Sequence, residues 1–251
     1  MEANKIIITG GANRIGAAIA EKLSGPGVEI VIHYKNSKIA AEKLKKKLSK
    51  NDSIIYLVKG NLSKETDLNK IIKFSKKKLK YFDCLINNAS LFENDKLENF
   101  TSKSWNHHLN VNLKAPAYLS KEFAKNTKGK SNNIINIIDQ RVFKLTPFFF
   151  SYTLSKTGLY TLTKTSAMSL APNIRVNGIA PGPTLKNKRQ SNKHFKKQYL
   201  STPLKKQVNV KEICSAVDFF LENKSITGQV LAVDSGQNLN WQTPDIIGTK
   251  E

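Results

Sequence analysis

The stretch Lys5-Ile-Ile-Ile-Thr9-Gly10-Gly11-Ala12-Asn13-Arg14-Ile15-Gly16 decides the fold. A short apolar run that ends in glycines predicts a buried strand followed by a tight turn. The small residues that follow predict a helix up to Leu23, and the apolar run Val28–His33 predicts a second strand. Because a crossover helix joins the two strands, they are expected to pair in parallel as a β-α-β unit.

The same alternation continues along the chain. Further strands are predicted at Ile54–Val58, Cys84–Asn87, Asn133–Ile138, Ile174–Asn177 and Gln229–Val233, and helices around 38–50, 64–79, 103–126, 150–170 and 210–222. Such alternation predicts a Rossmann-type, doubly wound parallel sheet with helices on both faces. No long linker divides the chain, so we expect one domain over 1–251. The weakly patterned segment 183–207 is expected to be a substrate lid with one helix at most.

The composition argues against several classes of protein. No apolar run approaches the roughly 20 residues that span a bilayer, and the first residues lack a signal-peptide pattern, so we expect a cytoplasmic protein without membrane contact. Cys84 and Cys214 lack the spacing of a zinc or redox site, which predicts two buried thiols and no metal. The net charge of +22 comes from dispersed lysines without stacking aromatic residues. A solvated basic surface is therefore favoured, and nucleic-acid binding is not.

The glycine-rich stretch is a candidate phosphate loop. Glycines at a strand-to-helix turn let the backbone approach a pyrophosphate, and a helix N-terminus favours anions, although an ordinary β-α turn would also account for them. Sites that select NAD carry an acid at the end of the second strand. This chain has His33-Tyr34-Lys35-Asn36-Ser37 there, whose cation and hydroxyl donors suit a 2′-phosphate. We therefore expect NADPH, with Lys35 alternatively one more surface lysine.

A second motif is Tyr152-Thr-Leu-Ser-Lys156, which places a phenol and an ammonium on one face of a helix. The ammonium is expected to lower the pKa of Tyr152 and to let the phenol donate a proton as hydride arrives. Taken alone, such a pair can equally be two incidental neighbours on a helix surface.

The order of the motifs makes the chain, from about Lys5 to Asn238, resemble the short-chain dehydrogenases/reductases. The landmarks in family order are Thr9–Gly16, Asn87-Asn88-Ala89, Val111-Asn112, Tyr152/Lys156, Arg175-Val-Asn177, Pro181-Gly182 and Ile226-Thr-Gly228. The resemblance implies that Tyr152 donates the proton, that Lys156 holds the nicotinamide ribose, and that Asn112 supports a water-linked proton path. It also implies a homotetramer or homodimer built through the helices around 103–126 and 150–170.

The expected cofactor site combines the phosphate loop, the end of the second strand and these landmarks. Its predicted residues are Gly10, Asn13, Arg14, Ile15, Gly16, His33, Tyr34, Lys35, Ser37, Asn61, Leu62, Asn88, Ala89, Ser90, Tyr152, Lys156, Pro181, Gly182 and Thr184. Asn61 stands where the family usually has Asp, and its carbonyl oxygen can still accept a hydrogen bond from the adenine amino group.

At three places the sequence differs from the usual residues of this family, and these differences indicate a particular group within it. Arg14 and Asp139 stand where most of the family has Gly and Ser, and Asn88-Ala89-Ser90-Leu91-Phe92 adds an aromatic ring. Together with His33-Tyr34 they resemble the pteridine reductases, including bacterial dihydromonapterin and dihydrofolate reductases. This implies a pterin stacked on Phe92 and protonated on a ring nitrogen through Asp139, Tyr152 and Lys156. The predicted substrate residues are therefore Arg14, Ser90, Phe92, Asp139 and Tyr152.

Alternatives remain for these residues and for the function. Phe92 can be a core aromatic residue, and Asp139 can cap a turn. The runner-up function is reduction of a carbonyl such as a 3-oxoacyl thioester, against which Asp139 argues because an ionised carboxylate repels an oxyanion. A non-catalytic basic nucleotide-binding or nucleic-acid-binding protein is the third. The lid cations can attract a glutamylated folate tail or simply be solvated: Lys186, Lys188, Arg189, Lys196 and Lys197.

Overall fold

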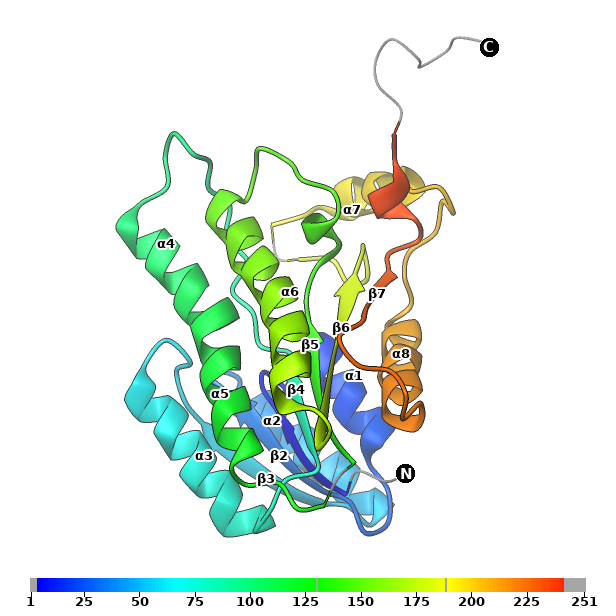
Figure 1. The fold of residues 1–251 in the computed structure, drawn as a ribbon. Helices are drawn as coiled ribbons and strands as arrows, with labels where there is room; N and C mark the ends of the chain where they lie inside the picture. The colour runs from blue at the N-terminus through cyan, green and yellow to red at the C-terminus, as the bar shows by residue number, and fades with distance from the viewer. Residues whose placement is uncertain (1–3, 130, 188, 242–251) are drawn as a thin grey trace, which may run out of the picture.

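The computed structural model describes residues 4–129, 131–187 and 189–241. Within them, parallel strands form one 7-stranded sheet in the order β3-β2-β1-β4-β5-β6-β7 (Figure 1). The strands are β1 (Lys5–Ile8), β2 (Glu29–Tyr34), β3 (Ile54–Lys59), β4 (Cys84–Asn87), β5 (Asn132–Ile137), β6 (Ile174–Pro181) and β7 (Val230–Val233). The strand order reverses between β1 and β4, so the predicted doubly wound fold is confirmed.

Helices cover both faces of the sheet (Figure 1). One face carries α1 (Arg14–Leu23), α2 (Lys38–Leu48) and α8 (Val210–Glu222), and the other carries α3 (Glu65–Leu79), α5 (Ala115–Ala124) and α6 (Phe150–Leu170). The central strand shows why its sequence is continuously apolar. Ile6 and Ile8 pack in the first of these two cores and Ile7 in the second, because successive side chains of a strand point to opposite faces.

One predicted segment differs in detail from the structure, and another agrees with it. The single helix expected around 103–126 consists of α4 (Ser102–Leu109), a π-helical segment (Asn110–Lys114) and α5. The segment 183–207 contains one helix, α7 (Asn192–Leu200), whereas Lys188 lies outside the described residues. No helix in the described part of the chain is long and apolar enough to cross a membrane. Cys84 and Cys214 are free and buried, as expected.

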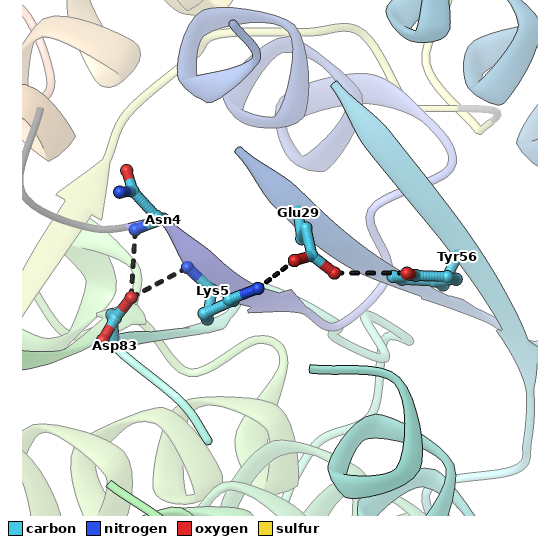
Figure 2. Close-up of polar contacts among 5 residues, drawn as sticks. All are labelled: Asn4, Lys5, Glu29, Tyr56 and Asp83. Carbon is cyan, nitrogen blue, oxygen red and sulfur yellow. Dashed lines mark hydrogen bonds and ion pairs between the residues drawn. The ribbon is translucent and has the colours of Figure 1, made fainter. Parts of the chain in front are cut away.

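A polar network links four strands near their amino ends (Figure 2). Lys5 forms an ion pair with Glu29, which also accepts a hydrogen bond from the Tyr56 hydroxyl at 3.1 Å. Asp83 Oδ2 accepts bonds from the backbone N–H groups of Asn4, at 3.1 Å, and Lys5, at 2.9 Å. These groups satisfy one another, so this edge of the sheet is held by the chain's own charges. The carboxyl ends of the strands are left to form the site.

Candidate active site

A cavity of about 970 Å³ lies at the carboxyl ends of the strands. Such an edge, at the point where the strand order reverses, is where open α/β sheets bind ligands. Asp139 is the one acid among the described residues that line the cavity. The lining cations are Arg14, Lys35, Arg141, Lys156 and Arg189. The cavity therefore has the charge expected for an anionic ligand.

The predicted phosphate loop is held by its glycines and by the side chain of Asn88. Gly10 adopts a φ of +61°, which favours glycine. The Asn88 side chain donates to the carbonyl oxygens of Thr9, at 2.9 Å, and Gly10, at 3.1 Å. A Cβ atom at Gly16 would lie 2.4 Å from that same amide, so a side chain there would displace Asn88. The Asn88 side chain therefore holds the loop in its conformation, and Asn88 also lines the cavity.

His33 supports this loop from below. Its Nδ1 accepts a 3.2 Å hydrogen bond from the Gly10 N–H, and its Nε2 donates to the Gly60 carbonyl at 3.0 Å. The ring is 2% exposed, and burial lowers the pKa of His33. A neutral imidazole with one acceptor and one donor nitrogen satisfies both bonds, and it joins the ends of β1, β2 and β3.

Arg14 connects the predicted phosphate loop to the segment 183–207. Its guanidinium donates to the carbonyl oxygens of Leu185 and Lys186, both at 2.8 Å. Its backbone has a φ of +56°, a left-handed conformation that costs a non-glycine residue about 1–2 kcal/mol. The glycine that is usual here in the resembling family would avoid this strain but would not contact Leu185 and Lys186.

The cavity collects most of the predicted cofactor residues, but not all. Tyr34 and Ser37 do not line it, whereas the neighbouring Lys35 does and is exposed. Asn61 lines it, but its side-chain oxygen already accepts bonds from the Ser63 N–H, at 3.2 Å, and hydroxyl, at 2.9 Å. The other lining residues of the predicted set are Gly10, Asn13, Arg14, Ile15, Gly16, His33, Leu62, Asn88, Ala89, Ser90, Tyr152, Lys156, Pro181, Gly182 and Thr184.

Tyr152 and Asp139 are in direct contact. The Tyr152 hydroxyl donates to Asp139 Oδ2 at 2.7 Å, and Lys156 Nζ donates to the Ile137 carbonyl at 2.8 Å. The two residues of α6 are 4% and 1% exposed, whereas Asp139 follows β5 and is half-buried. The predicted turn role of Asp139 coexists with the phenol contact, because its Oδ1 accepts from the Arg141 N–H at 2.9 Å.

The pKa of Tyr152 differs from the sequence-based expectation. Burial raises it well above its usual range, and the charge and hydrogen bond of Asp139 raise it further. The expected lowering of the Tyr152 pKa is therefore wrong, because burial and Asp139 shift this pKa upward. Burial lowers the pKa of Lys156 to about 8. Tyr152 thus holds its proton, as a proton donor must.

Asn112 lies behind the cavity wall and does not line it. Its side chain donates to the Leu91 carbonyl at 2.9 Å and to Ser155 Oγ at 3.0 Å, and accepts from the Leu91 N–H at 2.8 Å. These bonds fasten the loop after β4 to α6. The predicted part of Asn112 in a proton path stays a prediction.

An aromatic group stands beside Tyr152. The ring of Phe92 meets that of Tyr152 edge-on, with centroids 4.6 Å apart, and it stacks on Phe149 at 4.4 Å with an angle of 10° between the planes. Sequence reasoning identified Phe92, and named Arg189 among the cations of segment 183–207, but missed Phe149 and Arg141. The run Phe148-Phe149-Phe150 at the start of α6 was the available signal for Phe149. Arg141 had no such signal, because it meets the Phe149 ring only in the folded chain.

A buried polar chain holds the Phe92 loop in place. The Glu93 N–H donates to His108 Nε2 at 3.2 Å, and His108 Nδ1 donates to Ser151 Oγ at 2.7 Å. Ser151 in turn donates to the Asp95 carboxylate. His108 and Ser151 are both fully buried, so the start of α6 and the loop that carries Phe92 are fixed relative to each other. Sequence reasoning missed this network.

Comparison with known proteins identifies the family of the chain. Residues 10–238 match the family model described as enoyl-(acyl carrier protein) reductase. The chain therefore belongs to that family of the short-chain dehydrogenases/reductases, and the predicted family and enzyme class are confirmed.

The chain is similar to two kinds of reductase within this family. The chain is 42% identical to FolM alternative dihydrofolate reductase 1 from Brucella canis, solved in complex with NADP, with a TM-score of 0.92 and 96% of each chain covered. It is 34% identical to the 3-oxoacyl-[acyl-carrier-protein] reductase FabG of Buchnera aphidicola, covering 92% of this chain and 96% of that protein. It is 25% identical to the dihydromonapterin reductase of Enterobacter sp., covering 94% of this chain and 97% of that protein.

Proposed function

We propose that this chain is an NADPH-dependent reductase of a dihydropterin or dihydrofolate, acting in folate or biopterin metabolism. The observation that carries the proposal is the 2.7 Å hydrogen bond from Tyr152 to Asp139. A carboxyl group beside the proton donor suits reduction of a C=N bond, in which a ring nitrogen takes up a proton. The FolM protein of Brucella canis, at 42% identity, supports the same substrate class.

The residues present fit NADPH. No acidic residue stands in the first turn of α1, and the lining residues Asn13, Arg14 and Ile15 surround its N-terminus, which suits a pyrophosphate. Lys35, at the end of β2, would pair with the 2′-phosphate. Lys156 would hold the nicotinamide ribose, and Pro181 to Thr184 would border the carboxamide. Bound NADPH supplies the hydride.

The protein's own part is delivery of a proton. Tyr152 Oη carries the proton, which burial and Asp139 keep in place by raising its pKa. The proton passes to a ring nitrogen of the substrate, and the Lys156 ammonium stabilises the phenolate left behind. Asp139, whose carboxylate accepts the hydrogen bond of the same hydroxyl, would relay a proton from solvent back to that oxygen. Phe92 would supply the flat apolar surface against which the substrate ring stacks, with Arg14 and Ser90 at the cavity wall.

A carbonyl reductase is the second candidate. The 34% identity to a FabG protein and the Tyr152/Lys156 pair favour it, because that chemistry uses the same two groups. Asp139 stands against it. The enzyme-like contact between Tyr152 and Asp139 also speaks against a non-catalytic nucleotide-binding or nucleic-acid-binding protein.

An NADPH-oxidation assay decides between these candidates. The substrates are dihydromonapterin, dihydrobiopterin, dihydrofolate and a 3-oxoacyl thioester. We expect turnover with at least one of the first three, and a loss of about 100-fold in its kcat on Asp139→Asn, with NADPH affinity unchanged. Asp139→Ser, which introduces the usual family residue, is the matched variant. Unchanged pterin turnover in both variants would remove the role of Asp139, and turnover of the thioester alone would select the carbonyl reductase.

We also propose a homodimer or homotetramer formed through α4, α5 and α6. Two apolar side chains of α6 support this, Leu154 at 41% and Met168 at 74% exposure. Gel filtration with light scattering tests it, and a monomer would contradict it. A cytoplasmic location is proposed as well, for which the free thiols Cys84 and Cys214 speak.

A further inference from the structure

Two arginines from distant parts of the chain meet at the aromatic group. Arg141 lies in the short helical turn after Asp139, with its Cζ 4.6 Å from the centre of the Phe149 ring. Arg189 comes from the segment before α7, with its Cζ 5.2 Å from the centre of Phe92 and 5.6 Å from that of Phe149. Both line the cavity. The stacked rings therefore carry a guanidinium group from each of two loops.

Each guanidinium group has N–H donors without a hydrogen-bond partner among the described residues. Arg141 Nη1 donates to the Thr146 hydroxyl at 2.9 Å, and Arg189 Nη2 donates to the Phe92 carbonyl at 2.6 Å. A guanidinium has five N–H donors, so most remain available. Neither residue forms an ion pair with a carboxylate of the described residues. The aromatic faces hold the two planes in position while their charges stay uncompensated.

Their location assigns them to the substrate rather than to the dinucleotide. Phe92 touches Tyr152, the proton donor, edge-on at 4.6 Å, and the arginines lie on the Phe92–Phe149 pair. The phosphate loop has its own cation, Arg14, which is bonded to the lid at Leu185 and Lys186. A substrate ring bound beside Tyr152 would extend its side chain along the aromatic pair.

We propose that Arg141 and Arg189 bind the carboxylates of an anionic substrate tail and so make the enzyme prefer dihydrofolate over dihydropterins with neutral side chains. This inference rests on the proposed function. Planar guanidinium groups bind carboxylates through paired hydrogen bonds, and a dicarboxylate tail offers one carboxylate to each arginine. Of the lid cations, Arg189 is thus selected by its contacts with the aromatic pair.

The test compares two substrates that share a ring and differ in tail charge. kcat and KM are measured for dihydrofolate and for dihydrobiopterin with wild type, Arg141→Gln, Arg189→Gln and the double variant. Each single change should raise KM for dihydrofolate about tenfold, with kcat nearly unchanged, and should alter the values for dihydrobiopterin less than about twofold. Arg189→Lys keeps the charge and should therefore raise KM for dihydrofolate less than Arg189→Gln does.

Lys193→Gln is the matched control, because Lys193 is an exposed cation of α7 that does not line the cavity. It should leave both substrates unchanged. The KM of wild type for dihydrofolate should rise with salt, and that of the double variant should not. Equal losses for both substrates, or no loss for dihydrofolate, would overturn this inference and leave the proposed function standing. A wild-type enzyme that reduces neither substrate would overturn both.

Discussion

The two halves of the cavity are built differently. The half proposed for the dinucleotide is made of backbone held by side chains that bind the backbone, as when His33 and Asn88 bind Gly10. The half proposed for the substrate is made of side chains from separate loops, with Phe92 and Phe149 stacked on each other and contacted by Arg189. The first half depends on the ends of the strands, whereas the second depends on how loops meet. Changes in the first should therefore alter cofactor binding, and changes in the second should alter substrate choice.

The largest effect is expected where the two halves meet. Tyr152→Phe removes the hydroxyl that donates to Asp139 at 2.7 Å and should lower kcat about 10³-fold, within the range for loss of a general acid. The buried ring is kept, so NADPH affinity should stay within about twofold. Steady-state kinetics and titration of NADPH fluorescence measure the two quantities. A loss below about tenfold would show that another group donates the proton.

The pH profile tests the same junction. The pKa of Lys156 is lowered to about 8, so its ammonium loses a proton at lower pH than an ordinary lysine does. If catalysis needs this charge, kcat/KM should be at its maximum below pH 8 and should fall about tenfold per pH unit above it. The pKa of Tyr152 is raised, so the phenol does not cause this fall. The measurement is kcat/KM from roughly pH 6 to 10, because its pH dependence reports the pKa values of the free enzyme. A flat profile would contradict the role of Lys156.

A pair of variants separates the halves. His33→Gln disturbs two buried hydrogen bonds beneath the phosphate loop and should weaken NADPH binding about tenfold, with a lower Tm. Phe149→Ala removes the ring stacked on Phe92 and should raise KM for the pterin by about threefold without changing NADPH affinity. If His33→Gln changed only the pterin KM, or Phe149→Ala only the NADPH affinity, the division between the halves would be wrong.

The smallest effect is expected at the rim. Lys35 is exposed, so its pairing with a 2′-phosphate is worth about 1 kcal/mol, and Lys35→Ala should reduce the preference for NADPH over NADH about fivefold. Lys46→Ala, a change at an exposed lysine of α2 outside the cavity, is the control. An unaltered ratio of the two kcat/KM values would assign Lys35 to the solvated surface.

Much of the first half could be predicted from the sequence, because its signals are local. The glycines that need close backbone approach lie within Thr9–Gly16, and the four-residue spacing of Tyr152 and Lys156 fixes their common helix face. The second half could not be predicted in the same way. Arg189 and Phe92 are far apart in the chain and meet only because β4 and β6 end at the same edge of the sheet.

The pKa of Tyr152 was predicted in the wrong direction for a related reason. The spacing shows that Lys156 is near, but it does not show that the ammonium bonds to the Ile137 carbonyl or that the phenol is 4% exposed. Burial and partner choice are properties of the folded chain, and here they outweigh the proximity of the ammonium.

The π-helical segment Asn110–Lys114 has a consequence for which changes the chain tolerates. Its one extra residue rotates everything that follows by about 100° relative to a regular helix. One continuous helix can therefore direct α4 toward α6 and α5 toward α3. Asn112 sits at this change of phase and binds Leu91 from there. The segment should accept substitutions more readily than a deletion, since removing one residue would put either α4 or α5 out of phase with its neighbour.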